Sequence, residues 1–377
     1  MKAKMKLHLI IYIAIIAILT ACENEIPYHP GQQEPQLIMN TMLDAGQTEN
    51  YVYLHLSEGS TIGRVSEATL SLYVNNQLAE SPKAMTPEEI YSDLKGSWDQ
   101  ESYESILKNI KFKKFRLTTA LQPGDNIRLE AMAENGLYHV SAEVIVPYPV
   151  ESLHVDTCLS YLRVYNGQAL YRQFKITLHD RPNEKNYYRL EILNDISYRC
   201  EYREYAKDEN GNLIEAENGY DWAYTMKDTL ITEHQTEIIN REDVILTDGH
   251  PTSYDDEEND MFPTIKNKYN IFTDNRFSNS SATLKVYTNP FDDFFTPDIY
   301  YNRIHRNHTI TVRILSLSEA EYRYLRALNA LSDDDYDEAL MEPVSLPSNV
   351  MGGLGFVGIF SGTEYVMKLP EKTKPGY

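Results

Sequence analysis

The segment Ala68-Thr69-Leu70-Ser71-Leu72-Tyr73-Val74 alternates apolar with polar side chains and runs into Asn75-Asn76. A period of two places every second side chain on the same face, which is typical of a half-buried β-strand. The two asparagines are a turn signal that marks the end of this strand. Residues 52–56 show the same alternation, so this part of the chain predicts short strands joined by turns.

The strand pattern extends over residues 37–147, with turn signals at Pro123-Gly124-Asp125 and Asn135-Gly136. About seven short strands separated by turns predict an immunoglobulin-like β-sandwich. Two prolines cannot continue a central strand, so Pro147-Tyr148-Pro149 closes this domain.

A helical insertion is expected at about residues 86–110 of the sandwich. Thr86-Pro87-Glu88-Glu89 combines a cap residue, an early proline and an acid at the third position, which is a typical helix start. Further on, apolar residues recur at the spacing of one helical face. These residues are Tyr103, Ile106, Leu107 and Ile110.

Residues 150–377 predict a second, larger β-rich domain with long hairpins. Two Tyr-rich segments within residues 198–226 are joined by Asn210-Gly211 and indicate a long exposed hairpin. A helix is expected at about residues 318–331, where Ser318 and Glu321 have the spacing of a capping box.

The apolar stripe predicted for this helix consists of Tyr324, Ala327, Leu328 and Leu331. The fold class is therefore mainly β. An N-terminal immunoglobulin-like sandwich with a helical insertion is followed by a larger β-rich domain with a C-terminal helix.

Residues 1–21 have the pattern of a signal peptide, with lysines, an apolar run and a small residue before Cys22. An apolar run of about 10–14 residues is too short to be a stable membrane span. Leu19-Thr20-Ala21-Cys22 resembles the bacterial lipobox, so Cys22 is the expected lipidation site, followed by a lipidated tether over residues 22–36. An ordinary signal peptide that ends near a cysteine is the alternative.

The acidic residues Glu23 and Glu25 directly follow the cysteine. Such a stretch resembles the surface-export signal of lipoproteins in Gram-negative bacteria, which places the protein on the outer membrane facing the cell exterior. A lipoprotein that faces the periplasm is the alternative.

The chain is acidic, with a formal net charge of −21. Such a surface repels nucleic acid, so no nucleic-acid partner is predicted. The charge favours cationic or neutral ligands, although solubility alone explains an acidic surface. The 29 tyrosines suit sandwich cores, and also binding faces for sugars or peptides.

Few residues carry recognisable chemistry. A disulfide between Cys158 and Cys200 is compatible with an exported chain, and the sequence leaves it open. The G-x-G-x-x-G motif at 353–358 lacks the strand-helix context of a dinucleotide site and is interpreted as close backbone approach in a β-rich tail. Ser92-x-x-Lys95 and Ser105-x-x-Lys108 are interpreted as solvated helix faces.

Two further groups resemble metal ligands only in part. One combines His305 and His308 with nearby acids, which are Asp292, Asp293 and Asp298. The other is the alternating series Asp333, Asp335 and Asp337, which lacks the glycine and the final acid of a calcium loop. We therefore predict no metal site, no cofactor and no catalytic residue.

Taken in order, these features resemble the domain-of-unknown-function 4249 family of bacterial outer-membrane lipoproteins over nearly all of the mature chain. The segments that carry the resemblance are Cys22, the strands through Leu37 and Leu54, Pro123-Gly124-Asp125, Asp180-x-Pro182 with Asn186-Tyr187-Tyr188, the helix from Ser318, Glu342-Pro343-Val344, and Ser348-Asn349-Val350-x-Gly352-Gly353-Leu354-Gly355. The resemblance implies an outer-membrane lipoprotein, often encoded beside a TonB-dependent receptor, and it implies no activity.

We accordingly expect a surface-exposed outer-membrane lipoprotein that is held by its N-terminal lipid. It would act without catalysis, as a binding or accessory subunit of a TonB-dependent transporter, and a TonB-dependent outer-membrane barrel would be its partner. One alternative is a hydrolase of a surface polymer that uses carboxylates which the sequence does not single out. Another is a structural or adhesive surface protein. The ligand-binding residues are unknown.

Overall fold

The computed structural model describes residues 34–369 except for 59–60, 93–99, 165–166, 210, 220, 236, 253–265, 290–301 and 332–345. Only the backbone is described for residues 196–202, 227–235 and 302–307. The predicted signal peptide, Cys22 and nearly all of the tether therefore lie outside the described residues. No helix in the described part of the chain is long and apolar enough to cross a membrane.

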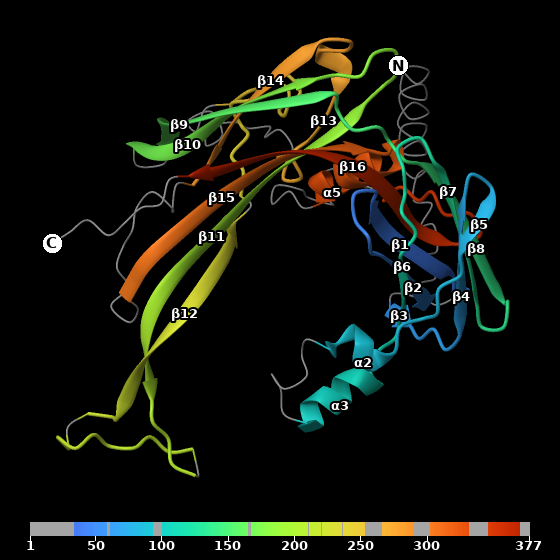
Figure 1. Ribbon diagram of the computed structural model, residues 1–377. Coiled ribbons are helices and arrows are strands. Elements are labelled where there is room, and N and C mark those ends of the chain that lie inside the picture. Colours follow the sequence, from blue (N-terminus) through green and yellow to red (C-terminus); the bar gives the residue numbers. More distant parts are fainter. Residues whose placement is uncertain are drawn as a thin grey trace, which may run out of the picture.

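Three sheets make up the described fold, and the largest extends through both halves of the molecule (Figure 1). This central sheet has the strand order β12 (Tyr224–Gln235), β11 (Tyr187–Tyr205), β15 (Asn302–Leu317), β16 (Leu354–Leu369), β1 (Leu37–Asp44), β2 (Asn50–Glu58) and β3 (Thr61–Gly63), with β13 (Ile271–Thr273) beside β11 and β6 (Lys113–Leu117) beside β2. The first cover sheet contains β5 (Gln77–Glu80), β4 (Ala68–Val74), β7 (Asn126–Ala133) and β8 (Tyr138–Ile145). The second cover sheet contains β14 (Ser281–Thr288), β10 (Gly167–His179) and β9 (Ser152–Val164).

The first cover sheet packs on the N-terminal strands of the central sheet. Val52 and Leu54 of β2 share one buried apolar cluster with Leu70 and Leu72 of β4. The alternation seen in the sequence is thus the alternation between core and surface of a two-layer sandwich. The predicted mainly β fold with its N-terminal sandwich is confirmed.

The second cover sheet packs on β11 and β15 around a second apolar cluster. At the edge of this cluster the fully buried Asp180 accepts hydrogen bonds from the Tyr188 hydroxyl at 2.6 Å and from the Asn279 backbone N–H at 2.9 Å. Burial, reinforced by this carboxylate, raises the pKa of Tyr188 and keeps its hydroxyl a donor. Asp180 thereby ties the end of β10 to β11 and to the turn before β14.

Strand β16 joins the two sandwiches because it pairs with a different partner along each half. Residues 354–360 pair in parallel with residues 38–44 of β1. Residues 360–369 pair antiparallel with residues 308–317 of β15. The division at residues 147–150 stays a prediction, but one continuous sheet extends across it.

The glycines before and within β16 permit this pairing. A Cβ atom on Gly353 would collide with the carbonyl oxygen of Leu37. Gly355 has φ +114° and lies against the backbone of Met39. The G-x-G-x-x-G motif therefore serves close approach between strands, as interpreted from the sequence, and it is followed by strand and not by helix.

A long β-hairpin projects from the central sheet beyond the two sandwiches. Strands β11 and β12 pair antiparallel up to Tyr205 and Tyr224, and their far end projects away from the rest of the molecule (Figure 1). Gly211 adopts φ +84° in the connection. The predicted long hairpin is confirmed.

The helical insertion is also confirmed. It contains α2 (Pro87–Ile90) and α3 (Gln100–Lys108). The Glu89 N–H donates to the Thr86 hydroxyl at 3.3 Å, and the Thr86 N–H donates to the Glu89 carboxylate at 2.7 Å. This reciprocal capping box is the one that the sequence indicated.

The C-terminal helix α5 (Glu319–Leu331) packs on β16. The Tyr324 ring stacks on Phe356, with ring centroids 4.3 Å apart. Only half of the expected capping box forms. The Glu321 N–H donates to the Ser318 hydroxyl at 3.4 Å, but the Ser318 N–H donates to the Ile359 carbonyl.

The predicted apolar stripe of α5 is partly wrong. The fully buried positions of this helix are Glu321, Leu325 and Asn329, whereas Leu331 is exposed. Two of these buried side chains are polar, and an analysis of hydrophobic periodicity passes over such positions. The Glu321 carboxyl lies next to Gly358, and neither of its oxygens has a hydrogen-bond partner within the described structure.

This buried carboxyl predicts a pH-dependent stability. Burial raises the pKa of Glu321 from 4.5 to about 8, and Arg189 opposes the shift. Between these values the folded chain keeps a proton that the unfolded chain loses, so the free energy of unfolding falls as the pH rises. We expect Glu321→Gln to remove this dependence and to increase the free energy of unfolding by a few kcal/mol at about pH 8.5, at about 1.4 kcal/mol per pH unit.

Urea unfolding at a series of pH values between about 4 and 9 measures the effect. The matched control is Glu101→Gln, because Glu101 lies exposed on α3. A pH profile of Glu321→Gln that coincides with that of the wild type would contradict the prediction.

Candidate functional site

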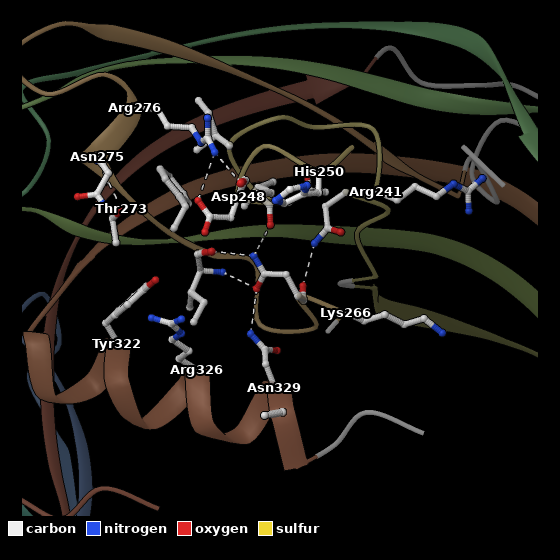
Figure 2. A pocket seen from close by; sticks show the side chains of 18 of the residues that line it. Arg241, Asp248, His250, Lys266, Thr273, Asn275, Arg276, Tyr322, Arg326 and Asn329 are labelled. Atoms are coloured by element: carbon white, nitrogen blue, oxygen red, sulfur yellow. Dashed lines mark hydrogen bonds and ion pairs between the residues drawn. The ribbon is translucent and has the colours of Figure 1, made fainter. Parts of the chain in front are cut away.

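A pocket of about 650 Å³ lies between α5, residues 240–252 and residues 266–276 (Figure 2). Helix α5 forms one wall, from which Tyr322, Arg326 and Asn329 are directed toward the two other segments. The spacing of these three residues puts them on one face of the helix, because residues three and four apart are neighbours on its surface. The pocket is therefore built on the same helix that covers β16.

Asn267 holds the three segments of the pocket together. Its side-chain amide donates to the carbonyl oxygens of Leu246 at 2.9 Å and of Ile271 at 2.7 Å. Its side-chain oxygen accepts from the Ile271 N–H and from the Asn329 side-chain amide, each at 3.0 Å. One side chain thus bonds to α5, to β13 and to the segment 240–252, and it fixes the spacing of the walls.

The pocket carries the opposite sign of charge to the chain as a whole. Its cationic residues are Arg241, Lys266, Arg276, Arg323 and Arg326, with His250 beside them. Asp248 is the one carboxylate in the lining that the structure describes. In a chain of net charge −21, this local excess of positive charge attracts anions.

Besides Arg241, which donates to a backbone carbonyl at 2.6 Å, two of the arginines are already paired with acidic residues. Arg276 donates to the Asp248 carbonyl at 2.6 Å and lies 3.6 Å from the carboxylate of the same residue. Arg323 forms an ion pair with Glu319 at 2.6 Å. Arg326 forms no ion pair with a described residue and lies on the α5 wall (Figure 2). Its guanidinium therefore has donors to offer a ligand.

Tyr322 adds a neutral donor beside Arg326. Burial raises the pKa of its hydroxyl, while Arg326 opposes the shift. The phenol therefore keeps its proton at neutral pH and is able to donate a hydrogen bond. The ring centroids of Tyr322 and Tyr187 lie 4.9 Å apart, so Tyr187 of β11 packs against the Tyr322 side chain.

Of the groups singled out in the sequence, those that the structure describes lie outside this pocket. Ser105 and Lys108 are exposed on α3, where Lys108 pairs with Glu104, which is the solvated helix face expected. Lys95 lies outside the described residues, so the pair with Ser92 is not placed. Cys158 is exposed and forms no disulfide, and the side chain of Cys200 is not among those described.

The partial metal patterns fall mostly on residues that the structure does not place. These are Asp292, Asp293, Asp298, Asp333, Asp335 and Asp337, together with the side chain of His305. His308 is buried, and its Nε2 lies 3.3 Å from the Asn194 side-chain oxygen. Among the described residues, no three His, Cys, Asp or Glu side chains gather as a possible metal site.

The pocket itself was not anticipated from the sequence. Its cations come from segments far apart in the chain, such as Arg241, Arg276 and Arg326, and no motif links them. One local signal was present, since Arg323 and Arg326 stand three apart on the predicted helix and so share a face.

The role of Asn267 can be tested by removing its side chain. We expect Asn267→Ala to lower the free energy of unfolding by about 2–3 kcal/mol, because several hydrogen bonds worth about 1 kcal/mol each are lost together. Urea unfolding measures this loss. Asn275→Ala is the matched control, since Asn275 lies in the same lining and is exposed. Equal stabilities of the two variants would show that Asn267 does not hold the walls.

Comparison with curated proteins finds no match. Among solved structures, a DUF4785 family protein from Legionella pneumophila matches with 8% sequence identity and a TM-score of 0.21, over 74% of this chain and 52% of that chain. This chain thus spans about half the length of that protein, and a TM-score so low does not establish a shared fold. The family described as "Domain of unknown function (DUF4249)" matches residues 23–365. Because this match covers most of the chain, the protein belongs to the DUF4249 family.

Proposed function

We propose that this protein is a lipid-anchored binding protein of the outer membrane. It is displayed on the cell surface as an accessory subunit of a TonB-dependent transporter, and its basic pocket takes an anionic ligand. The observation that carries the proposal is the inversion of charge at the pocket.

The chemistry of the pocket suits carboxylate, phosphate or sulfate groups. Arginine presents a planar fork of donors that matches such oxygens in pairs. Arg326, together with the Tyr322 hydroxyl, supplies donors on the α5 wall. A volume of about 650 Å³ falls within the range of about 300–1,000 Å³ of small-molecule sites. A small polyanion would therefore fit.

The lining favours binding over hydrolysis of a polymer. Glycoside hydrolysis uses two carboxyl groups about 5–10 Å apart. Asp248 is the one carboxylate among the described lining residues, and it already faces Arg276. The described walls thus offer donors to an anion and no pair of carboxyl groups.

The location rests on the N-terminal sequence. Cys22 follows the lipobox-like Leu19-Thr20-Ala21, and Glu23 and Glu25 follow the cysteine. The transporter as partner rests on the gene neighbourhood that the family resemblance implies. A lipid tether would keep the pocket close to a barrel in the same membrane and so raise its effective concentration there.

Titration with defined small anions tests the pocket. We expect pyrophosphate and citrate to bind more tightly than the neutral sugar cellobiose, and their binding to weaken as salt is added. Arg326→Glu should weaken the binding of both anions at least tenfold, because the change replaces a donor with a repelling charge. Isothermal titration calorimetry measures these affinities.

The control for this charge reversal is Lys83→Glu, which makes the same change of charge at an exposed residue outside the pocket. An equal loss of anion affinity in the two variants would show that the effect comes from net charge and not from the pocket. Wild-type protein that binds none of the anions would refute the anion site.

Substitution of the lipidation residue tests the anchor. We expect full-length Cys22→Ala to leave the outer-membrane fraction for the soluble extract, whereas Cys158→Ala stays in the membrane. Fractionation and the mass of the N-terminal peptide measure this. Gentle purification of the wild-type lipoprotein should also recover a TonB-dependent barrel in stoichiometric amount. Recovery of the protein alone would remove the transporter from the proposal.

A further inference from the structure

The far end of the β11–β12 hairpin gathers large apolar side chains that the fold does not cover. They are Tyr205, Leu213, Ile214, Trp222, Tyr224 and Met226, each between 39% and 53% exposed. Exposed apolar residues scattered singly are ordinary, but a group of aromatic and aliphatic side chains on one projecting element indicates an interaction site. The hairpin carries this group away from both sandwiches (Figure 1).

The backbone of this hairpin tip, which is residues 205–226 without 210 and 220, is held by its own hydrogen bonds. The Ala206 N–H donates to the Ala223 carbonyl, the Ala223 N–H to the Ile214 carbonyl, and the Ile214 N–H to the Ala206 carbonyl. Two isolated β-bridges add to these backbone contacts. One joins Lys207 to Leu213, and the other joins Glu215 to Trp222.

Two asparagine and aspartate pairs close the turns of the hairpin tip. The Asp208 carboxylate accepts from the Asn212 backbone N–H at 2.8 Å and from its side chain at 3.0 Å. The Asn218 side-chain oxygen accepts from the Asp221 N–H at 3.2 Å. A segment ordered in this way loses little conformational freedom when it docks, which is a property of good binding elements.

The two aromatic rings at the base of the hairpin tip are also held in a defined geometry. Tyr205 and Tyr224 meet edge to face, with centroids 6.2 Å apart, and the Arg203 guanidinium lies 4.6 Å from the Tyr224 ring centroid. Aromatic residues presented by a rigid backbone are the commonest hot spots of protein interfaces.

Charge decides which partner these apolar residues meet. The acids of the hairpin tip are Asp208, Glu209, Glu215, Glu217 and Asp221, against Lys207 as its one cation. Such a segment is repelled by anionic lipid head groups, and a second copy of a chain of net charge −21 is repelled as well. A different protein with positive charge around an apolar recess is the complementary partner.

We propose that the hairpin tip is a protein-docking element, which inserts Trp222 and its apolar neighbours into an apolar recess rimmed by lysine and arginine on another protein. This docking is separate from the anion pocket and goes beyond the proposed function.

Photo-crosslinking in the full, membrane-bound protein tests this proposal. Benzoylphenylalanine is placed in place of Trp222, and in a second strain in place of Tyr161, which is 69% exposed on β9. We expect position 222 to form an adduct of defined mass with one other protein, and position 161 to form none. The crosslinked peptide of that partner should lie in an apolar recess flanked by lysine or arginine.

The identified partner is then purified and its affinity for the chain is measured. We expect Trp222→Ala to weaken binding at least tenfold, and Leu78→Ala, which truncates an exposed residue of β5, to leave it unchanged. The double charge reversal Glu209→Lys with Glu217→Lys should weaken binding at least fivefold and reduce its sensitivity to salt.

Four outcomes would overturn the proposal. They are adducts of position 222 with a second copy of this chain, equal adducts from positions 222 and 161, no protein adduct at all, and binding of the wild-type chain to phosphatidylglycerol vesicles that Trp222→Ala abolishes. The last outcome would make the hairpin tip a membrane-contacting element.

Discussion

The two-sided pairing of β16 is the constraint on which the described fold depends. Its first half completes one sandwich by pairing with β1, and its second half completes the other by pairing with β15. Without this strand the central sheet would divide into two separate sheets, one in each sandwich. The parallel contact also demands backbone without a side chain at Gly353, which explains a glycine-rich segment that would otherwise resemble a loop.

The same strand determines where the candidate site lies. Helix α5 covers the face of β16 that the first sandwich leaves free, and its outer side forms a wall of the pocket. The inner side contains Glu321, whose burial without a hydrogen-bond partner is unfavourable for stability at neutral pH. The buried face of α5 is thus not optimised for stability. The walls of the pocket, in contrast, are connected by the hydrogen bonds of Asn267.

Local patterns in the sequence were sufficient for the strand at residues 68–74, the long hairpin and the helical insertion. The alternation at residues 68–74 and the cap at Thr86 depend on neighbours along the chain, and both were recovered in the structure. The inner face of α5 was not predicted correctly, because the buried Glu321 interrupts the hydrophobic periodicity of the helix. The pocket was missed for a different reason, since Arg241 and Arg326 meet only through tertiary packing. Net charge also gave no guide to the sign of charge at one place on the surface.

The distance between β1 and β16 along the chain has a consequence for the order of folding. The Phe356 N–H donates to the Asn40 side-chain oxygen across a separation of 316 residues. At a synthesis rate of about 5–20 residues per second, roughly 15–60 seconds separate the appearance of these two residues on the ribosome. During that interval one edge of β1 has no strand beside it, so the nascent chain exposes a site for wrong pairing with other chains. The N-terminal sandwich is therefore completed only after residues 354–360 have been made, and shielding of this edge by a chaperone would be of use until then.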